Sequence, residues 1–375
     1  MKKIERILQN TLNKEWNGGK IIMVLGPRQV GKTTLIKEIC DSKGDYLFIN
    51  GDDIEDKQLL LNAGENKLKQ IIGQHKTIFI DEAQRINDIG ITLKIIHDRM
   101  PSVQVVISGS SALELSNSVN EPLTGRKWEH LLFPISWQEM INHFGYIETH
   151  KNLSHHLIFG LYPEIVMNPL EAEKRLKELA NSYLYKDLLQ YQKIRKPEVL
   201  DKLLIALALQ IGSEVNYNEL ANTLRIDRAT IEQYISLLEK AFIVFRLQPL
   251  SKNVRTEIST NRKIYFYDNG IRNAIIRNFT SLELRNDVGA LWENFLVAEK
   301  MKARHYSGWN GRAYYWRTYA QQEIDYVEES NGNYSSYEFK WSAKQQAKFP
   351  ITFLNAYKPI EKQVVTPENM GDFLL

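Results

Sequence analysis

Short apolar runs followed by polar or amphipathic sequence mark the first third of the chain. Ile21–Leu25 is apolar throughout, and Thr77–Gln84 and Val103–Ser108 contain runs of the same kind. Runs without alternating polar positions are typical of strands buried on both faces of a parallel sheet. The sequence LIKEIC, which follows the first run after a short loop, has a helical pattern. This alternation predicts an α/β domain.

Helical periodicity dominates the middle of the chain. Glu171–Tyr191 is strongly charged with apolar residues at helical spacing, which predicts one long amphipathic helix. Beyond Pro197, three further helices are predicted over Glu198–Ile211, Tyr217–Leu224 and Arg228–Ala241. The last two are joined by only a few residues, which is the geometry of a helix-turn-helix.

Two apolar runs with strand character follow the helix-turn-helix. Phe242–Leu250 and Lys263–Tyr267 are rich in β-branched and aromatic residues, which predicts the two strands of a wing. Asp227 lies where it can cap the third helix. The segment is therefore predicted to be a winged helix. The residues of its third helix that would face the major groove of DNA are Arg228, Thr230, Gln233 and Tyr234.

The C-terminal part predicts a helix followed by a β-hairpin. Ala290–Arg304 has helical periodicity, and Tyr314–Trp316 has strand character. The segment EIDYVEE, a polar turn at Ser330–Asn333 and the segment SSYEFKW then predict two antiparallel strands. We therefore expect a small α/β domain here.

Composition narrows the class of protein. The chain has 375 residues, of which 43% are apolar and 25% charged, values typical of a globular multi-domain protein. The one cysteine, Cys40, excludes an internal disulfide. The apolar runs fall short of the ~18 residues of a membrane helix, and the N-terminal segment lacks the apolar core of a signal peptide. We expect a cytoplasmic protein without a membrane partner.

The near-neutral total charge conceals a local excess of basic residues. The formal net charge is +3, from 48 basic and 45 acidic residues, which argues against a broadly basic surface. Between Lys240 and Arg285, however, nine residues are basic and three acidic. Because this segment contains the predicted wing, DNA is an expected partner; the alternatives are an ordinary solvated face and a winged helix that contacts protein. The residues expected to contact DNA phosphates are Lys252, Arg255, Arg262 and Lys263.

The first apolar run leads into GPRQVGKTT, residues Gly26–Thr34. This sequence has the form G-x-x-x-x-G-K-T between a strand and a helix, the context of a phosphate-binding loop. The glycines let the backbone approach phosphate oxygens. Lys32 reaches the β- and γ-phosphates, and the hydroxyl of Thr33 holds Mg²⁺. ATP and Mg²⁺ are the expected cofactors. The loop residues assigned to the nucleotide are Gly26, Gln29, Gly31, Lys32, Thr33 and Thr34.

Two acids, Asp81 and Glu82, end the second apolar run. Asp81 is placed to bind the Mg²⁺ shell, and Glu82 to orient or deprotonate an attacking water. The third run ends in SGSS, where Ser110 is expected to sense the γ-phosphate. The motifs, in order and at strand ends, predict nucleotide binding and, through Glu82, hydrolysis.

These residues resemble a known family. GPRQVGKTTL, IFIDEAQRI, VVISGSS and LTGRKWEHLLFPISWQEM are similar, in this order, to the prokaryotic AAA+-like (AAA_14) P-loop ATPases with a C-terminal DUF4143 domain. The resemblance extends from about Lys20 to about Trp341. In such proteins an arginine near the end of the ATPase core often contacts the γ-phosphate. This implies that role for Arg126, from the same or a neighbouring subunit; the alternative is a structural ion pair.

Three acids and a lysine in the C-terminal part suggest metal chemistry. Asp325 and Glu338 lie on the two hairpin strands, where they can face each other, and Lys340 falls on the same face as Glu338. Two carboxylates bind a divalent metal, a lysine positions the attacking water, and Glu293 adds a ligand from the helix. The arrangement resembles the PD-(D/E)xK restriction-endonuclease-like fold. An ordinary hairpin with a surface ion pair would have the same sequence.

The predicted fold class is α/β. It comprises a P-loop NTPase parallel sheet, an α-helical linker with a winged helix, and a smaller restriction-endonuclease-like α/β domain. The expected parts are an ATPase domain over 1–145, a helical linker over 146–197, a winged helix over 198–285 and the C-terminal domain over 286–375.

Two functions fit these predictions. The first is an ATP-binding and ATP-hydrolysing protein associated with DNA, in which the nucleotide state controls DNA engagement and metal-dependent phosphodiester cleavage. The second is a nucleotide-dependent regulatory switch whose C-terminal domain binds protein or nucleic acid without catalysis. Convergence of Asp325, Glu338 and Lys340 on a cleft with room for a metal would favour the first. A protein partner or a homo-oligomer is compatible with both.

Overall fold

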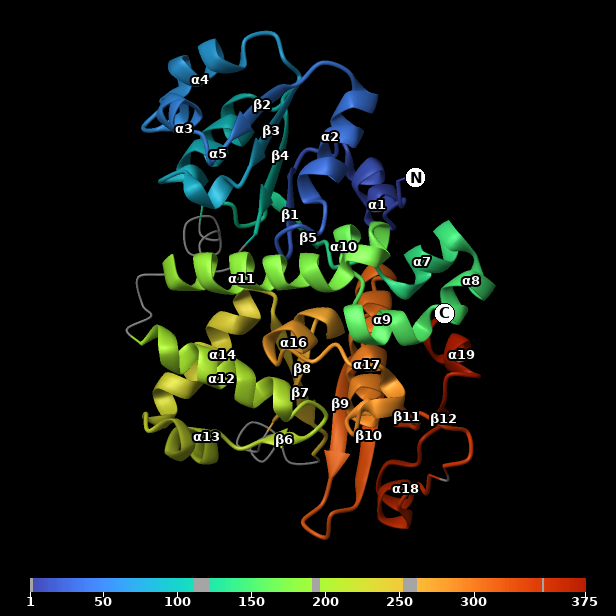
Figure 1. Ribbon diagram of the computed structural model, residues 1–375. Coiled ribbons are helices and arrows are strands. Elements are labelled where there is room, and N and C mark those ends of the chain that lie inside the picture. Colours follow the sequence, from blue (N-terminus) through green and yellow to red (C-terminus); the bar gives the residue numbers. More distant parts are fainter. Residues whose placement is uncertain (1–2, 111–121, 191–195, 252–261, 346) are drawn as a thin grey trace. The chain divides into compact units, whose positions relative to one another are not determined.

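The computed structural model describes residues 3–110, 122–190, 196–251, 262–345 and 347–375, with 182–190 described by their backbone alone. The chain forms two compact units (Figure 1). The first unit comprises Met1–Ile135 with Lys240–Phe242, and the second comprises Ser136–Glu239 with Ile243–Leu375. Within the described residues, no helix is both long and apolar enough to cross a membrane.

A parallel five-stranded sheet forms the centre of the first unit, with strand order β2-β3-β4-β1-β5. Every residue of β1, β3 and β4 is buried, because helices cover both faces of the sheet. The predicted parallel sheet is therefore present. Its strands are β1 (Ile21–Leu25), β2 (Leu47–Asn50), β3 (Thr77–Asp81), β4 (Gln104–Gly109) and β5 (Lys127–Leu131).

The helices of the first unit pack on the two faces of this sheet. In Figure 1, α1 and α2 lie on one side and α3, α4 and α5 on the other. For α2 and for α3 to α5, this arrangement follows from right-handed crossovers, since the connection from β1 to β2 runs in the opposite direction to the later ones. The helices are α1 (Leu8–Glu15), α2 (Lys32–Lys43), α3 (Ile54–Leu60), α4 (Glu65–Ile72) and α5 (Ile89–Arg99).

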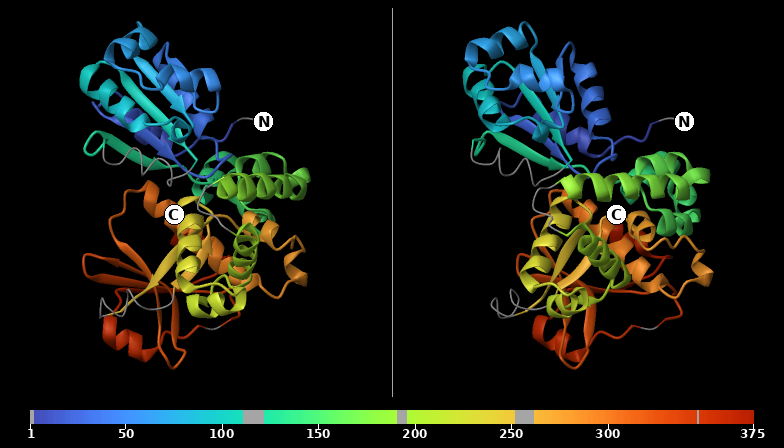
Figure 2. Two further views of the ribbon diagram at one scale, coloured as in Figure 1. Left: turned by 90° about the vertical axis from the view of Figure 1, so that its left-hand side faces the viewer. Right: turned by 60° about the vertical axis from the view of Figure 1, so that its left-hand side comes forward.

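A seven-stranded mixed sheet runs through the second unit, in the order β12-β11-β10-β9-β7-β8-β6. Figure 2 shows its strands continuing from the yellow part of the chain into the orange and red part. The strands are β6 (Glu214–Val215), β7 (Val244–Pro249), β8 (Arg262–Phe266), β9 (Arg312–Arg317), β10 (Glu323–Ser330), β11 (Asn333–Phe339) and β12 (Glu361–Val365).

Helices surround this sheet in the second unit. The predicted helix over 217–224 is present with the same bounds, and the long helix expected over 171–191 spans 172–190. The helices are α7 (Trp137–Phe144), α8 (Tyr146–Lys151), α9 (Leu153–Phe159), α10 (Pro163–Met167), α11 (Ala172–Gln190), α12 (Pro197–Leu209), α13 (Tyr217–Leu224), α14 (Arg228–Lys240), α16 (Asn269–Ile275), α17 (Val288–Tyr306), α18 (Ile351–Tyr357) and α19 (Met370–Leu374).

The buried helix α17 connects segments that are far apart in the sequence. Asn294 accepts a hydrogen bond from the Phe266 amide (2.8 Å) and donates one to the Phe266 carbonyl (3.1 Å), which attaches the helix to β8. One turn and a half later, Glu299 accepts a hydrogen bond from the Trp137 amide (2.6 Å) at the start of α7. These buried polar groups stabilise the fold only because each has a partner.

The structure groups the chain differently from the four expected parts. The linker, the wing strands and the C-terminal strands all lie in the second unit, which begins at Ser136 rather than near 145. The reason is that β7 pairs in parallel with β9, through Gln248↔Tyr314 and Pro249↔Tyr315, so the two modules share one sheet. Such pairing covers backbone groups that a separate wing would leave open at a sheet edge.

Asp287, the residue before α17, neutralises two buried arginines. Its carboxylate is 2.6 Å from Nη1 of Arg272 and 2.8 Å from Nε of Arg285. Both guanidinium groups are nearly inaccessible to solvent. Burial alone would raise the pKa of Asp287, but the hydrogen bonds from Arg285 and Arg272 outweigh it and lower this pKa to about 2. A single carboxylate therefore compensates two cations of the basic segment.

We predict that Asp287→Asn destabilises the second unit by about 2 kcal/mol at pH 7, because it leaves two buried guanidinium groups without a counter-charge. The pKa is lowered in the folded state. The contribution of Asp287 is therefore present above the unfolded pKa of ~4 and is lost as the pH falls towards about 2. Urea unfolding of both proteins at pH 7 measures the effect. The control is Asp98→Asn, which breaks an exposed pair with Arg126 and should shift the midpoint much less.

Candidate functional site

The phosphate loop follows β1 at the carboxyl edge of the first sheet. Gly26 and Gly31 have φ angles of 148° and 92°, which favour glycine. A Cβ atom on Gly26 would lie 2.1 Å from the carbonyl oxygen of Leu132, so no side chain fits there. Gln29 is exposed in the same loop, and Thr34 is exposed in the first turn of α2. The loop therefore presents backbone to a ligand, as the motif predicts.

Lys32 folds back over its own loop. Its buried ammonium group donates to the carbonyl oxygens of Gly26 (2.9 Å) and Pro27 (2.8 Å). These contacts hold a cation at the centre of the loop, at the beginning of α2. A phosphate group would meet the ammonium group and the first amides of the helix together.

Thr33, Asp81 and Ser108 form a hydrogen-bonded group at the ends of three elements. The Thr33 hydroxyl donates to Asp81 Oδ2 (2.8 Å), and the Ser108 hydroxyl donates to Asp81 Oδ1. The carboxylate and the hydroxyl are hard oxygen donors at one point, the kind of ligand that Mg²⁺ prefers. The residues predicted to hold Mg²⁺, Thr33 and Asp81, are thus brought together and fit the ion.

Glu82 is held by two neighbours beside this group. Its backbone is left-handed, with φ 47°, and its carboxylate accepts a hydrogen bond from the Ser110 hydroxyl (2.9 Å). Gln84 donates to the same carboxylate and also to Ser110 (3.0 Å). The structure therefore adds Gln84 to Glu82 and Ser110, the two residues that the sequence predicted here. Its position two residues after Glu82 in DEAQ was the available signal.

Arg126 lies at the opposite edge of the sheet from the phosphate loop. It immediately precedes β5, which runs parallel to β1 from Ile21↔Lys127 to Leu25↔Leu131. The five residues of β5 separate the two edges by ~16 Å at ~3.3 Å per residue. Arg126 therefore cannot reach a γ-phosphate in its own loop. Instead it donates to both oxygens of Asp98, at 2.8 Å and 3.1 Å, as the structural alternative expects.

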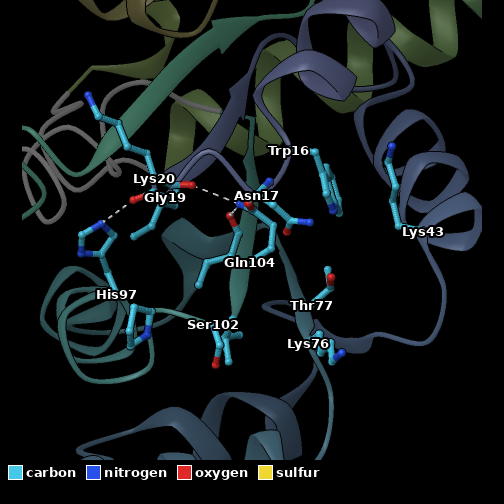
Figure 3. A pocket seen from close by; sticks show the side chains of 14 residues that line it. Trp16, Asn17, Gly19, Lys20, Lys43, Lys76, Thr77, His97, Ser102 and Gln104 are labelled. Atoms are coloured by element: carbon cyan, nitrogen blue, oxygen red, sulfur yellow. Dashed lines mark hydrogen bonds between the residues drawn. The ribbon is translucent and has the colours of Figure 1, made fainter.

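A pocket of about 390 Å³ is also found at this far edge of the sheet (Figure 3). Gln104 crosses it, donating to the Lys20 carbonyl (3.1 Å) and accepting from the Asn17 amide (2.8 Å). His97, the neighbour of Asp98, contacts the Gly19 carbonyl there (3.1 Å). The pocket lies at the amino ends of β1, β3 and β4, so it is distinct from the phosphate loop.

Comparison with known proteins agrees with the geometry of the first unit. Residues 18–141 match the AAA domain family. Residues 150–282 and 288–373 match two domains of unknown function, DUF8612 and DUF4143. The Walker-type ATPase PABY2304 of Pyrococcus abyssi has the same fold, with a TM-score of 0.51 and 15% identity, over 73% of this chain and 96% of that one. These findings support a P-loop ATPase.

Relatives with similar sequences are found in bacteria and in the archaeon Methanocaldococcus jannaschii. The uncharacterized protein Rv2008c of Mycobacterium tuberculosis is 26% identical over 88% of this chain and 72% of its own length. An uncharacterized protein of Haemophilus influenzae is 27% identical over 67% of this chain and 68% of its own length. The match of the former covers most of the chain, including parts of both units.

Two of the C-terminal acids lie on neighbouring strands of the second sheet, Asp325 on β10 and Glu338 on β11. Tyr326 pairs with Tyr337, a register that places Asp325 opposite Glu338, as predicted. Lys340 Nζ contacts Glu338 (3.1 Å), and Asp325 accepts a hydrogen bond from the Phe339 amide (2.8 Å). Burial and the neighbouring Asp325 carboxylate raise the pKa of Glu338 to about 7. Asp325, Glu338 and Lys340 are thus brought together.

Glu293 does not complete a metal site with them. Its carboxylate accepts hydrogen bonds from the Lys263 ammonium group (2.9 Å) and the Tyr265 hydroxyl (2.6 Å), both from β8. Among the described residues, no three or more His, Cys, Asp or Glu side chains are grouped so that they could hold a metal. The expected ligand set of Glu293, Asp325 and Glu338 is therefore not formed, because a lysine ammonium group is bound to Glu293.

The predicted DNA-contacting residues are also placed differently. Lys263 is buried, with 1% of its side chain exposed, so it cannot contact a phosphate at the surface. Tyr234 is buried in the core and does not face a groove. Arg262 is half-buried at the start of β8. Lys252 and Arg255 lie outside the described residues.

We predict that Arg126→Ala keeps the ATP affinity of the wild type within about twofold, because a charge ~16 Å from the loop is screened over more than one Debye length. Equilibrium binding of a fluorescent ATP analogue measures this affinity. The control is Lys32→Ala, which removes the cation from the loop and should abolish binding. A loss of affinity in Arg126→Ala equal to that in Lys32→Ala would contradict the geometry.

The same two variants distinguish a role in a neighbouring subunit. Arg126→Ala chains keep an intact loop, and Lys32→Ala chains keep an intact arginine. If a neighbour supplies Arg126, mixing two inactive variants restores part of the turnover. If turnover of Arg126→Ala alone equals that of the wild type, Arg126 is only the ion-pair partner of Asp98.

Proposed function

We propose that this chain binds ATP with Mg²⁺ at the loop of residues 26–34 and hydrolyses it. The observation that carries the proposal is the group of Thr33, Asp81 and Ser108, joined by hydrogen bonds next to the buried ammonium group of Lys32. The three side chains come from α2, β3 and β4. The Thr33 hydroxyl and the Asp81 carboxylate are the oxygen ligands that a Mg²⁺ ion requires. A chance glycine loop would not be accompanied by an acid at the end of β3.

The mechanism follows from the positions of these groups. The amides of the loop and Lys32 bind the phosphates, and the oxygens of Thr33 and Asp81 hold the metal. Bound Mg²⁺ supplies positive charge to the phosphate oxygens. Glu82 accepts the proton of the attacking water or orients it. Ser110 and Gln84 position the Glu82 carboxylate by donating hydrogen bonds to it.

We predict that Glu82→Gln lowers kcat for ATP hydrolysis by about 10²–10⁴-fold, the usual contribution of a general base, and leaves ATP affinity nearly unchanged. Phosphate release under saturating Mg²⁺-ATP measures kcat. Glu55→Gln, on the exposed first turn of α3, is the matched control and should not change it. Undiminished turnover in Glu82→Gln would show that another group acts as the base.

We further propose that the middle module is a winged helix that contacts DNA under control of the nucleotide state. Three helices and a strand pair occur in the required order, and Asp227 caps α14 through the Thr230 amide and hydroxyl, both at 2.8 Å. Arg228 and Gln233 are exposed on α14. These two residues, rather than Lys263 or Tyr234, are the described candidates for DNA contact.

Duplex DNA is therefore expected to stimulate ATP hydrolysis, and the stimulation should weaken steeply with rising salt because phosphate contacts release counterions. Arg228→Glu should raise the DNA concentration needed for half-maximal stimulation by about tenfold, as expected for reversal of one contact charge. Lys362→Glu makes the same charge change on β12 and serves as the control. If both variants need the same DNA concentration, or if DNA does not stimulate hydrolysis at all, a protein partner is favoured.

For the C-terminal module, we propose the non-catalytic alternative. Asp325, Glu338 and Lys340 meet, as a restriction-endonuclease-like fold would require, and this supports a resemblance of fold. The third acid is bound to Lys263, however, which opposes metal-dependent cleavage. The second unit would then bind DNA or protein without cutting it.

A further inference from the structure

We infer that the ammonium group of Lys263 takes the place of a divalent cation in the C-terminal acid cluster, so that this chain neutralises the cluster with its own lysine. The cluster consists of Glu293, Glu323, Asp325 and Glu338. The inference deepens the non-catalytic role proposed above for the C-terminal module. It also assigns to Lys263 a position inside the protein instead of the expected one at a DNA surface.

The geometry places Lys263 between two carboxylates from different elements. Its Nζ atom is 2.9 Å from Glu293 on α17 and 2.5 Å from Glu323 on β10. Only 1% of its side chain is exposed, and 13% of that of Glu293. The ammonium group is thus nearly inaccessible to water and is bridged by two acids, of which Glu323 is 28% exposed. Such pairing is what a buried cation requires.

Neighbouring groups leave little room for a metal and its waters around Glu293. The Tyr265 hydroxyl is 2.6 Å from the oxygen that binds Lys263. On the other side, a Cβ atom on Gly212 would lie 2.9 Å from Oε2 of Glu293. Oε1 of this carboxylate thus already has two donors, and the space beside Oε2 is too small even for a methyl group on residue 212. Mg²⁺ usually keeps several waters when it binds, which this packing opposes.

Lys263 cannot withdraw easily to admit a metal. Its backbone lies in the middle of a three-stranded array, where it is the register partner of Glu214 on β6 and of Leu247 on β7. Displacement of the ammonium group would also leave a charge inside the unit without a partner. Such an unpaired buried charge is strongly destabilising.

The lysine and the acids come from different modules. Lys263 lies in the segment that matches DUF8612, whereas Glu293, Glu323 and Asp325 lie in the segment that matches DUF4143. Packing of the two modules therefore brings the cation to the acids. The same contact between the two modules neutralises the cluster and joins their strands into one sheet.

The test is Mn²⁺ binding to the full-length chain without nucleotide, measured from the free-Mn²⁺ electron paramagnetic resonance signal. We expect the wild type and Asp325→Asn to bind Mn²⁺ equally weakly. Lys263→Met, which removes the ammonium group and keeps the volume, should gain one site with an affinity about tenfold or more above the wild type. That site should be absent from Lys263→Met/Asp325→Asn and from Lys263→Arg, which retains a cation.

The wild-type comparison keeps the inference falsifiable even if Lys263→Met does not fold. Mn²⁺ binding in the wild type that Asp325→Asn abolishes would overturn it, as would Mn²⁺-dependent cleavage of plasmid DNA that depends on Asp325. Equal binding and equal background cleavage in both proteins would support it. ATP hydrolysis is measured in parallel, so that failure of this inference is distinguishable from failure of the proposed ATPase function.

Discussion

A buried ammonium group requires opposite charge around it, and Lys263 imposes this requirement on the second unit. Glu293 on α17 and Glu323 on β10 supply the opposite charge. Burial alone would lower the pKa of Lys263, but the carboxylates of Glu293, Asp325 and Glu323 raise it. In return, the lysine keeps Glu293, whose pKa burial raises to about 7, close to a compensating charge. These ion pairs connect β8 to α17 and β10, while the pairing of β7 with β9 makes the sheet continuous.

The nucleotide site depends on a different constraint, the close approach of backbone to ligand. Gly26 is needed because the Leu132 carbonyl leaves no space for a side chain, and Lys32 fills the centre of the loop. Asp81 connects the loop to β4 through Ser108. The loop, the metal-binding oxygens and the candidate base thus lie at the carboxyl ends of parallel strands, where α/β proteins bind ligands. The ion pair of Arg126 lies at the amino ends of the strands.

The local charge excess shows where sequence reasoning failed and why. The basic residues between 240 and 285 suggested an exposed binding face, since the same window contains few acids. In the structure their partners come from outside that window: Glu239 for Arg246, Asp287 for Arg272 and Arg285, and Glu293 with Glu323 for Lys263. Glu239 and Asp287 lie just outside the window, so the excess depends in part on where the window ends. Glu293 and Glu323 are far from Lys263 in the sequence, and only the tertiary fold brings them to it.

The sequence by itself determined the local elements and the nucleotide motif, because both depend on residues close together in the chain. Apolar runs specify β1 and β3, helical periodicity specifies α13 and α14, and the loop glycines follow from their own backbone geometry. The tertiary structure alone decided which charges are paired, which edge of the sheet Arg126 occupies and whether two modules share a sheet. These outcomes depend on strand pairing and burial between distant segments, which local pattern does not encode.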